Sequence, residues 1–351
     1  MSEDDNQRRP GGPQGLLQAW PWLVFPLLPL VIALGALHLL YGDDFAFAVP
    51  QEGTSCLLPS PSGFVASFIS STHREFVHFK GLLVYVSVGF LHTALCLLAV
   101  VYFVAQIRDL PAPLGRRAWQ LVGLLLVILI FAGFLAAADK TALQLTYRNT
   151  CELLCKAQVA GHIVPRECHG GPPSRLLWLA SVPTLAGMIA AVFAAAVAST
   201  AAGVFPKSSE EEWRAAFAER VRTVQRAFYL TSAVLVTSTV SIKLFLELPA
   251  ALSADEATTV AIDSFANGMT GFWGTVFSLT LVMIFAPSAY FMLTAAQRHE
   301  RMSETPSEVR AWLSEQVTAS LPQQVGNLAA AMAPLLVGPI GTLFQRLVEM
   351  G

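Results

Sequence analysis

The sequence has little charge, and long stretches of it have none. Charged residues make up 13% of the 351 residues and hydrophobic residues 54%, with a mean hydropathy of +0.55. A soluble domain usually has about 25% charged residues. The net charge of −2 and the lack of a basic segment give no support to nucleic-acid binding, so we expect no nucleic-acid partner.

The sequence also lacks the short motifs of common membrane enzymes. It contains no Cys-x-x-Cys pair, no metalloprotease motif and no paired-aspartate protease signature. Of the seven histidines, only His38 and His92 lie within apolar runs, and a membrane haem usually needs more such pairs. We therefore expect no cofactor, and an enzyme is the least favoured class.

Long apolar runs are what the sequence does contain. A helix needs about 20 apolar residues to cross a bilayer. Six runs qualify: Trp22–Leu40, Leu82–Ala105, Trp119–Ala138, Leu176–Ala202, Phe228–Leu248 and Gly271–Thr294. A soluble core has no need of so many helices that are apolar on every side. The sequence predicts an all-α fold, a polytopic integral membrane helix bundle of about six spans embedded in a lipid bilayer.

The distribution of lysine and arginine predicts the orientation. The side that holds both termini has 14 of these residues and the opposite side has 7, while the loop Pro249–Thr270 has none. Positive loops favour the cytoplasm, so we expect both termini there. The compact chain favours a bacterial inner or plasma membrane.

This orientation divides the chain into three parts. We predict a cytoplasmic tail (1–20), a six-span membrane domain (21–296) and a cytoplasmic amphipathic C-terminal segment (297–351). The membrane domain includes outer loops 41–79 and 139–175 and a cytoplasmic helix 208–226. Ala46-Phe47-Ala48 after the first run leaves signal-peptide cleavage as an alternative, but the length of the run favours a retained anchor.

Four of the five cysteines fall on the outer side. They are Cys56 in the first outer loop and Cys151, Cys155 and Cys168 in the second. In an oxidising compartment they predict two disulfides, at least one of which joins the two loops because Cys56 is alone in its loop. A metal site is the alternative, with these candidate ligands: Cys151, Cys155, His162, Cys168 and His169. Their spacing matches no familiar zinc motif, so we expect disulfides and no metal.

Polar residues inside the spans are candidate functional residues, because charge is costly in a membrane. Lys243 and Glu247 lie four residues apart in the fifth span, where they can pair on one helix face. Ser232 and Thr239 extend this face inward, and His92 lies near the middle of the second span. Together they form a predicted intramembrane polar site. The structural alternative is an interface ion pair, hydroxyls bonded within helices, and an interhelical histidine.

Small residues recur in two of the spans. Alanine occurs every four residues from Ala186 to Ala202, which allows close helix contact and predicts a central position or an oligomer interface. The sixth span opens with Gly268, Gly271 and Gly274. A homo-oligomer or a membrane partner subunit is therefore a candidate partner.

Capping boxes predict two further helices on the cytoplasmic side. Ser209-x-x-Glu212 predicts one long helix from about Glu210 through the fifth span, with an apolar stripe suited to headgroups or a partner helix. Thr305-x-x-Glu308 predicts another, beginning at Pro306. The uncharged run Val325–Phe344 follows. Its one-sided pattern favours an interfacial or re-entrant segment over a seventh span.

Three functions fit these features. The first is a channel or transporter subunit that moves a small solute or ion along a polar path in the fifth span. The second is a non-enzymatic sensor or assembly subunit that acts through its outer loops and cytoplasmic tail. The third is a membrane redox protein that uses the outer cysteines.

Overall fold

The chain is α-helical throughout the part that the structure describes. The structure is a computed structural model, and it describes residues 64–138, 175–200, 209–247, 256–302, 306–317 and 326–337. The long helices are α2 (Phe64–Arg108), α3 (Ala112–Ala138), α5 (Arg175–Thr200), α6 (Glu210–Glu247) and α7 (Glu256–Met302). Two short helices follow, α8 (Pro306–Val317) and a helix Gly326–Val337, which we call the C-terminal helix. The all-α prediction is confirmed for these residues.

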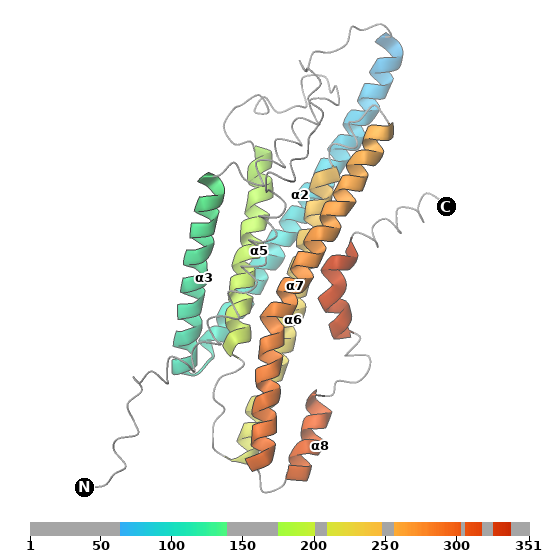
Figure 1. Ribbon diagram of the computed structural model, residues 1–351. Helices are drawn as coiled ribbons and strands as arrows, with labels where there is room; N and C mark the ends of the chain where they lie inside the picture. The colour runs from blue at the N-terminus through green and yellow to red at the C-terminus, as the bar shows by residue number, and fades with distance from the viewer. Residues whose placement is uncertain are drawn as a thin grey trace, which may run out of the picture.

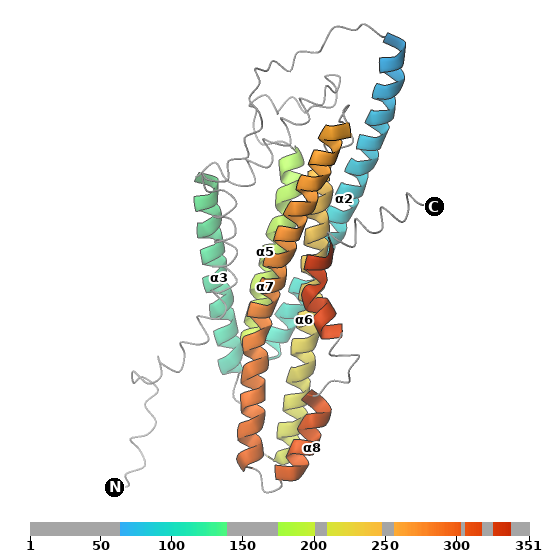
Figure 2. The same ribbon diagram turned by 45° about the vertical axis from the view of Figure 1, so that its right-hand side comes forward.

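The long helices alternate in direction. In Figure 1, α2, α5 and α7 run from the upper to the lower end of the bundle, and α3 and α6 run back up. Figures 1 and 2 together show α5, α6 and α7 side by side, with α2 crossing the bundle obliquely. The lower end, where α2 stops and α6 starts, corresponds to the predicted cytoplasmic side.

Four helices in the described part of the chain are long and apolar enough to cross a membrane. Their candidate spans are Leu83–Arg108, Val182–Thr200, Glu210–Glu247 and Asp263–Arg301. They coincide with the second, fourth, fifth and sixth predicted runs. The third run lies in α3, and the first, Trp22–Leu40, lies outside the described residues. By helix length and hydropathy the chain is a candidate multi-pass membrane protein, and six spans stays a prediction.

Helix α5 is central because its small side chains let its neighbours approach closely. It packs against α2, α3, α6 and α7. Ala194, Ala196 and Ala198 are fully buried in the main core between these helices. With little hydrophobic drive between helices in lipid, such close packing stabilises the bundle. The central position predicted from the alanine pattern is observed.

Helix α6 begins where its capping box predicts. The Glu212 amide donates to Ser209 Oγ at 3.3 Å. With 38 residues the helix is about 57 Å long, against a hydrocarbon core of about 30 Å. Its first turns, the end of α7 and α8 project below α2, α3 and α5 (Figure 1). α8 begins at Pro306, as its own capping box predicts.

One segment predicted as a loop contains helix, because α7 begins at Glu256, within the predicted loop Pro249–Thr270. α2 begins at Phe64, in the second half of the first outer loop, where the sequence Gly63–Phe79 predicts a helix that leads into the second span. Both helices therefore extend beyond their apolar runs at the upper end of the bundle. The remaining parts of these loops, and most of outer loop 139–175, lie outside the described residues.

Candidate functional site

The charged pair of the fifth span lies near the upper end of α6. Lys243 Nζ is 3.3 Å from Glu247 Oε1, and the side chains are 9% and 22% exposed. Asp263 of α7 interacts electrostatically with both residues. One ammonium group thus faces two carboxylates at the contact between two helices. We call these three residues the charged cluster.

Apolar side chains adjoin the charged cluster. Leu246 of α6 and Ala266 and Met269 of α7 form a small buried core there, with Trp273 packed against it. On the other side of α6, the buried Tyr85 of α2 lies 5.6 Å from Phe245 between ring centroids. In such surroundings the charges interact more strongly than in water, and an unpaired charge is costly.

The hydroxyl groups of Ser232 and Thr239 on α6 form hydrogen bonds with backbone carbonyl groups. Thr239 Oγ1 donates to the Leu235 carbonyl of its own helix at 2.9 Å. Ser232 Oγ donates to the Ala330 carbonyl of the C-terminal helix at 2.5 Å. Both residues are buried. They lie on the same side of α6 as Lys243, but their hydroxyls are bonded to backbone rather than to the charged cluster.

His92 is held between three helices. Its Nδ1 lies 2.7 Å from Thr237 Oγ1 of α6, and its Nε2 lies 3.2 Å from the Pro183 carbonyl of α5. A β-carbon on Gly187 would lie 3.3 Å from Nε2, so glycine provides the space for the ring. His92 is almost completely buried. This geometry agrees with the structural alternative, in which His92 forms hydrogen bonds between helices.

The contacts of His92 suit either protonation state. In the neutral ring, Nε2–H donates to Pro183 and Nδ1 accepts from the Thr237 hydroxyl. In the charged ring, Nδ1–H donates to Thr237 Oγ1, whose hydroxyl then donates to the carbonyl of Ala233 or Val234, each 3.0 Å away. Rotation of a single hydroxyl therefore satisfies both states.

The five predicted site residues do not come together in one place. Six residues separate Thr237, the partner of His92, from Lys243, which corresponds to about 240° around α6. His92 therefore lies on the α2–α5 side of α6, and the charged cluster on the α7 side. These are two sites rather than one polar path.

Cys96 is the one cysteine in the described ranges, and it is free and buried. Its sulfur lies 3.4 Å from His92 Nε2. The predicted disulfide residues and metal ligands all lie outside the described residues: Cys56, Cys151, Cys155, His162, Cys168 and His169. Within the described segments no group of three or more histidine, cysteine, aspartate or glutamate side chains could hold a metal ion.

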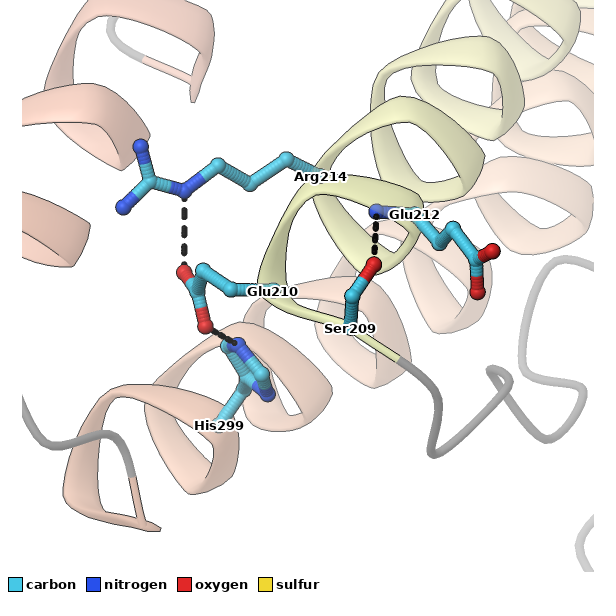
Figure 3. Close-up of polar contacts among 5 residues, drawn as sticks. All are labelled: Ser209, Glu210, Glu212, Arg214 and His299. Carbon is cyan, nitrogen blue, oxygen red and sulfur yellow. Dashed lines mark hydrogen bonds and ion pairs between the residues drawn. The ribbon is translucent and has the colours of Figure 1, made fainter.

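A second polar cluster lies on the projecting lower end. Glu210 Oε1 accepts from Arg214 Nε at 2.9 Å, and Glu210 Oε2 lies 2.8 Å from His299 Nε2 of α7 (Figure 3). The His299 ring stacks on Trp213, with centroids 3.7 Å apart. Arg214 lies over the ring of Trp312 of α8 at 5.6 Å. The apolar stripe of the predicted cytoplasmic helix is therefore covered by α7 and α8 of the same chain.

The sequence alone did not indicate the roles of Asp263 and Thr237. Asp263 was assigned to a loop because the apolar run begins eight residues later, although α7 already includes it. If Glu256–Thr270 is taken as helical, Asp263 lies about two turns before the start of the apolar run at Gly271. Thr237 is one of several hydroxyl residues in the fifth span, and its partner His92 lies 145 residues away in the sequence.

Comparisons of the chain with protein-family models, curated proteins and solved structures found no match. The functional interpretation therefore rests on the geometry of His92 and its partners, of the charged cluster, and of the lower cluster.

Proposed function

We propose that the protein is a multi-pass membrane transporter or channel subunit that moves a small cation or proton past the charged cluster. The observation that supports this is the placement of Lys243, Glu247 and Asp263 between α6 and α7. Ionisable groups in spans are costly, so each one is a candidate for an ion or proton pathway. The excess of carboxylate over ammonium favours a positively charged substrate.

The lysine acts as a tethered counter-ion in this proposal. When the site is empty, Lys243 neutralises Glu247. A cation or proton that reaches the cluster takes the place of the lysine on one carboxylate, and its departure restores the pair. The position near the upper end of α6 makes the cluster the outer site of such a route.

The proposal is tested with full-length protein in lipid vesicles. A potassium gradient with valinomycin drives proton influx, which trapped pyranine reports, and radioactive sodium tests a metal cation. We expect flux above that of protein-free vesicles, and its loss in Glu247→Gln. Glu219→Gln is the matched control, because Glu219 forms an exposed ion pair with Arg222 at 3.3 Å at the other end of α6.

Two results would count against the proposal. If vesicles that contain the wild-type protein show no more proton or sodium flux than protein-free vesicles, the proposed transport function is wrong. Equal flux in wild type and Glu247→Gln would separate transport from the charged cluster. In both cases the folded state of each variant is checked by gel filtration.

The lower cluster favours a second candidate, a sensor or assembly subunit. Here α6, α7 and α8 project together from the bundle and are joined through Trp213, Phe217 and Trp312. A partner bound there would be lost when Met302–Gly351 is removed but retained in Glu247→Gln. The redox alternative depends on outer cysteines that lie outside the described residues.

A further inference from the structure

The C-terminal helix, as far as the structure describes it, is shorter than a membrane span. The helix from Gly326 to Val337 has a length of about 18 Å, against about 30 Å for the hydrocarbon core. It nevertheless lies alongside α6 and α7, on the outside of the bundle and well above α8, in both views (Figures 1 and 2). The contacts of this helix with α6 and α7 indicate how far it lies above the lower membrane edge.

Exposed arginines give the level of the lower membrane edge. Thr223 of α6 donates to Gln106 of α2 at 3.3 Å, which brings the end of α2 level with this part of α6. Arg108, Arg222 and Arg226 are exposed close to this contact. Arginine at such a level is typical of the cytoplasmic interface.

The C-terminal helix contacts α6 above this level. The Tyr229 hydroxyl donates to Asn327, less than one turn beyond Arg226. Ser232 Oγ donates to the Ala330 carbonyl, nearly one turn higher. The helix therefore rises along α6 from the interface into the apolar part of the span.

Its contact with α7 is closer still. A β-carbon on Gly274 would collide with the Pro334 carbonyl oxygen and would lie 2.9 Å from Leu335 Cα. Pro334 is fully buried, and Ala331 packs against the main core. Backbone contact of this kind is typical of helices packed inside a membrane.

The opposite face of the C-terminal helix is apolar and exposed. Leu328, Met332 and Leu336 recur every four residues and are 65%, 37% and 39% exposed. At the depth set by Ser232 and Gly274, their surroundings are acyl chains rather than water. The helix thus has a small-residue face toward protein and a large apolar face toward lipid.

We propose that Gly326–Val337 is a re-entrant half-helix that enters the bilayer from the α8 side and closes the α6–α7 contact below the charged cluster. Gly338 and Pro339 follow it directly in the sequence and are typical of a helix end, which would place this end within the bilayer. It covers Ser232, on the same side of α6 as Lys243, between the charged cluster and the lower edge. The insertion of this helix into the bilayer is inferred from its packing against α6 and α7 alone. Its role in closing the α6–α7 contact rests on the proposed function.

Depth measurements test the insertion. Nitroxide labels are attached at Leu328→Cys, Met332→Cys or Leu336→Cys in full-length protein in vesicles, and the background from the native cysteines is subtracted. Relative access of oxygen and a water-soluble nickel complex then reports depth. A half-helix gives depths that increase by about 6 Å from 328 to 332 to 336. Leu279→Cys in the α7 span and Glu219→Cys on the exposed lower part of α6 calibrate lipid and water.

A flat interfacial helix would give equal depths at the three positions, and a tail detached from the bundle would give water exposure at all three. Either result overturns the proposal. Neither depends on whether the protein transports anything.

Gly274→Val tests docking and closure. The larger side chain displaces the C-terminal helix, so the label at Met332→Cys becomes more mobile. Gly271→Val is the matched control, because a β-carbon there has no neighbour within 4 Å. If the wild-type flux exists, Gly274→Val raises it. If the label at Met332→Cys becomes more mobile but the flux does not increase, the helix does not close the α6–α7 contact, although its insertion into the bilayer still holds. If the wild-type protein shows no flux, the proposed transport function is overturned, and the insertion is not affected.

Discussion

At the scale of single residues, Lys243 is the group on which the charged cluster depends. Among the described residues, it is the one ammonium group that interacts with both Glu247 and Asp263. Removing one partner from a buried ion pair costs more than removing the pair, because the remaining charge has neither water nor a counter-ion. Here the remaining groups also repel each other.

We therefore expect Lys243→Met to lower the free energy of unfolding by about 2–3 kcal/mol, less than for a fully buried pair because Glu247 is 22% exposed. The double variant with Glu247→Gln should recover part of this loss. Tryptophan fluorescence during unfolding in mixed micelles measures both. A double variant no more stable than the single one would indicate that water already screens the cluster.

The three glycines at the start of the sixth span show what sequence alone could not predict at this scale. Gly268, Gly271 and Gly274 look alike in the sequence, yet a β-carbon at the first two has no neighbour within 4 Å, whereas at Gly274 it collides with the C-terminal helix. The difference comes from a contact with Pro334, 60 residues away. Local patterns carry no information on such a contact.

At the scale of helices, local signals predicted well where helices begin. Ser209 caps α6 and Pro306 opens α8, because capping depends on residues within one turn. The start of α7 was missed because its first turns are polar and continue as helix above the apolar run. The position of the C-terminal helix against α6 and α7 depends on tertiary packing, so the sequence left re-entrant and interfacial placement open.

The contact between α8 and the bundle gives a prediction at the same scale. Trp213 is buried between His299, Phe217 and Trp312, with ring centroids 3.7, 5.1 and 6.0 Å away. Trp213→Ala removes most of this contact, at a cost of about 3–5 kcal/mol. Hydrogen exchange of residues 306–317 should then become faster, while exchange of residues 92–103 in the core of α2 stays slow.

Trp119→Ala is the control for this experiment. Trp119 is half exposed on α3 and contacts Phe193 edge to face at 6.1 Å, far from α8. It should leave the exchange of α8 unchanged. Slow exchange of α8 in Trp213→Ala would mean that other contacts hold this helix.

At the scale of the whole molecule, four of the six apolar runs coincide with helices that are long and apolar enough to cross a membrane. Hydropathy can indicate such helices because each span must satisfy its own backbone in lipid, so the signal is local. Which polar groups share a site was not predicted, because that depends on how helices are rotated against one another. His92 and Lys243 thus fall on different sides of α6.

The cysteines test the orientation of the whole chain. Alkylation of denatured, unreduced protein from native membranes should modify one thiol, Cys96, if the four outer cysteines form two disulfides. In the folded protein Cys96 should stay unmodified, because it is 1% exposed. Mass spectrometry counts the added groups. Five modified thiols would mean that the outer cysteines are reduced, and elemental analysis for zinc would then follow.

The length of α6 has a mechanical consequence. Helix α6 is continuous from Lys243 to Glu210, and it extends about 24 Å below Arg226. A rigid rod of that length, pivoting at the membrane edge by about 10°, swings its tip by about 4 Å. Because α7 and α8 pack against that tip, and Lys243 lies about 26 Å on the other side of Arg226, a tilt that moves the charged cluster moves the tip by a similar distance in the opposite direction, on the predicted cytoplasmic side.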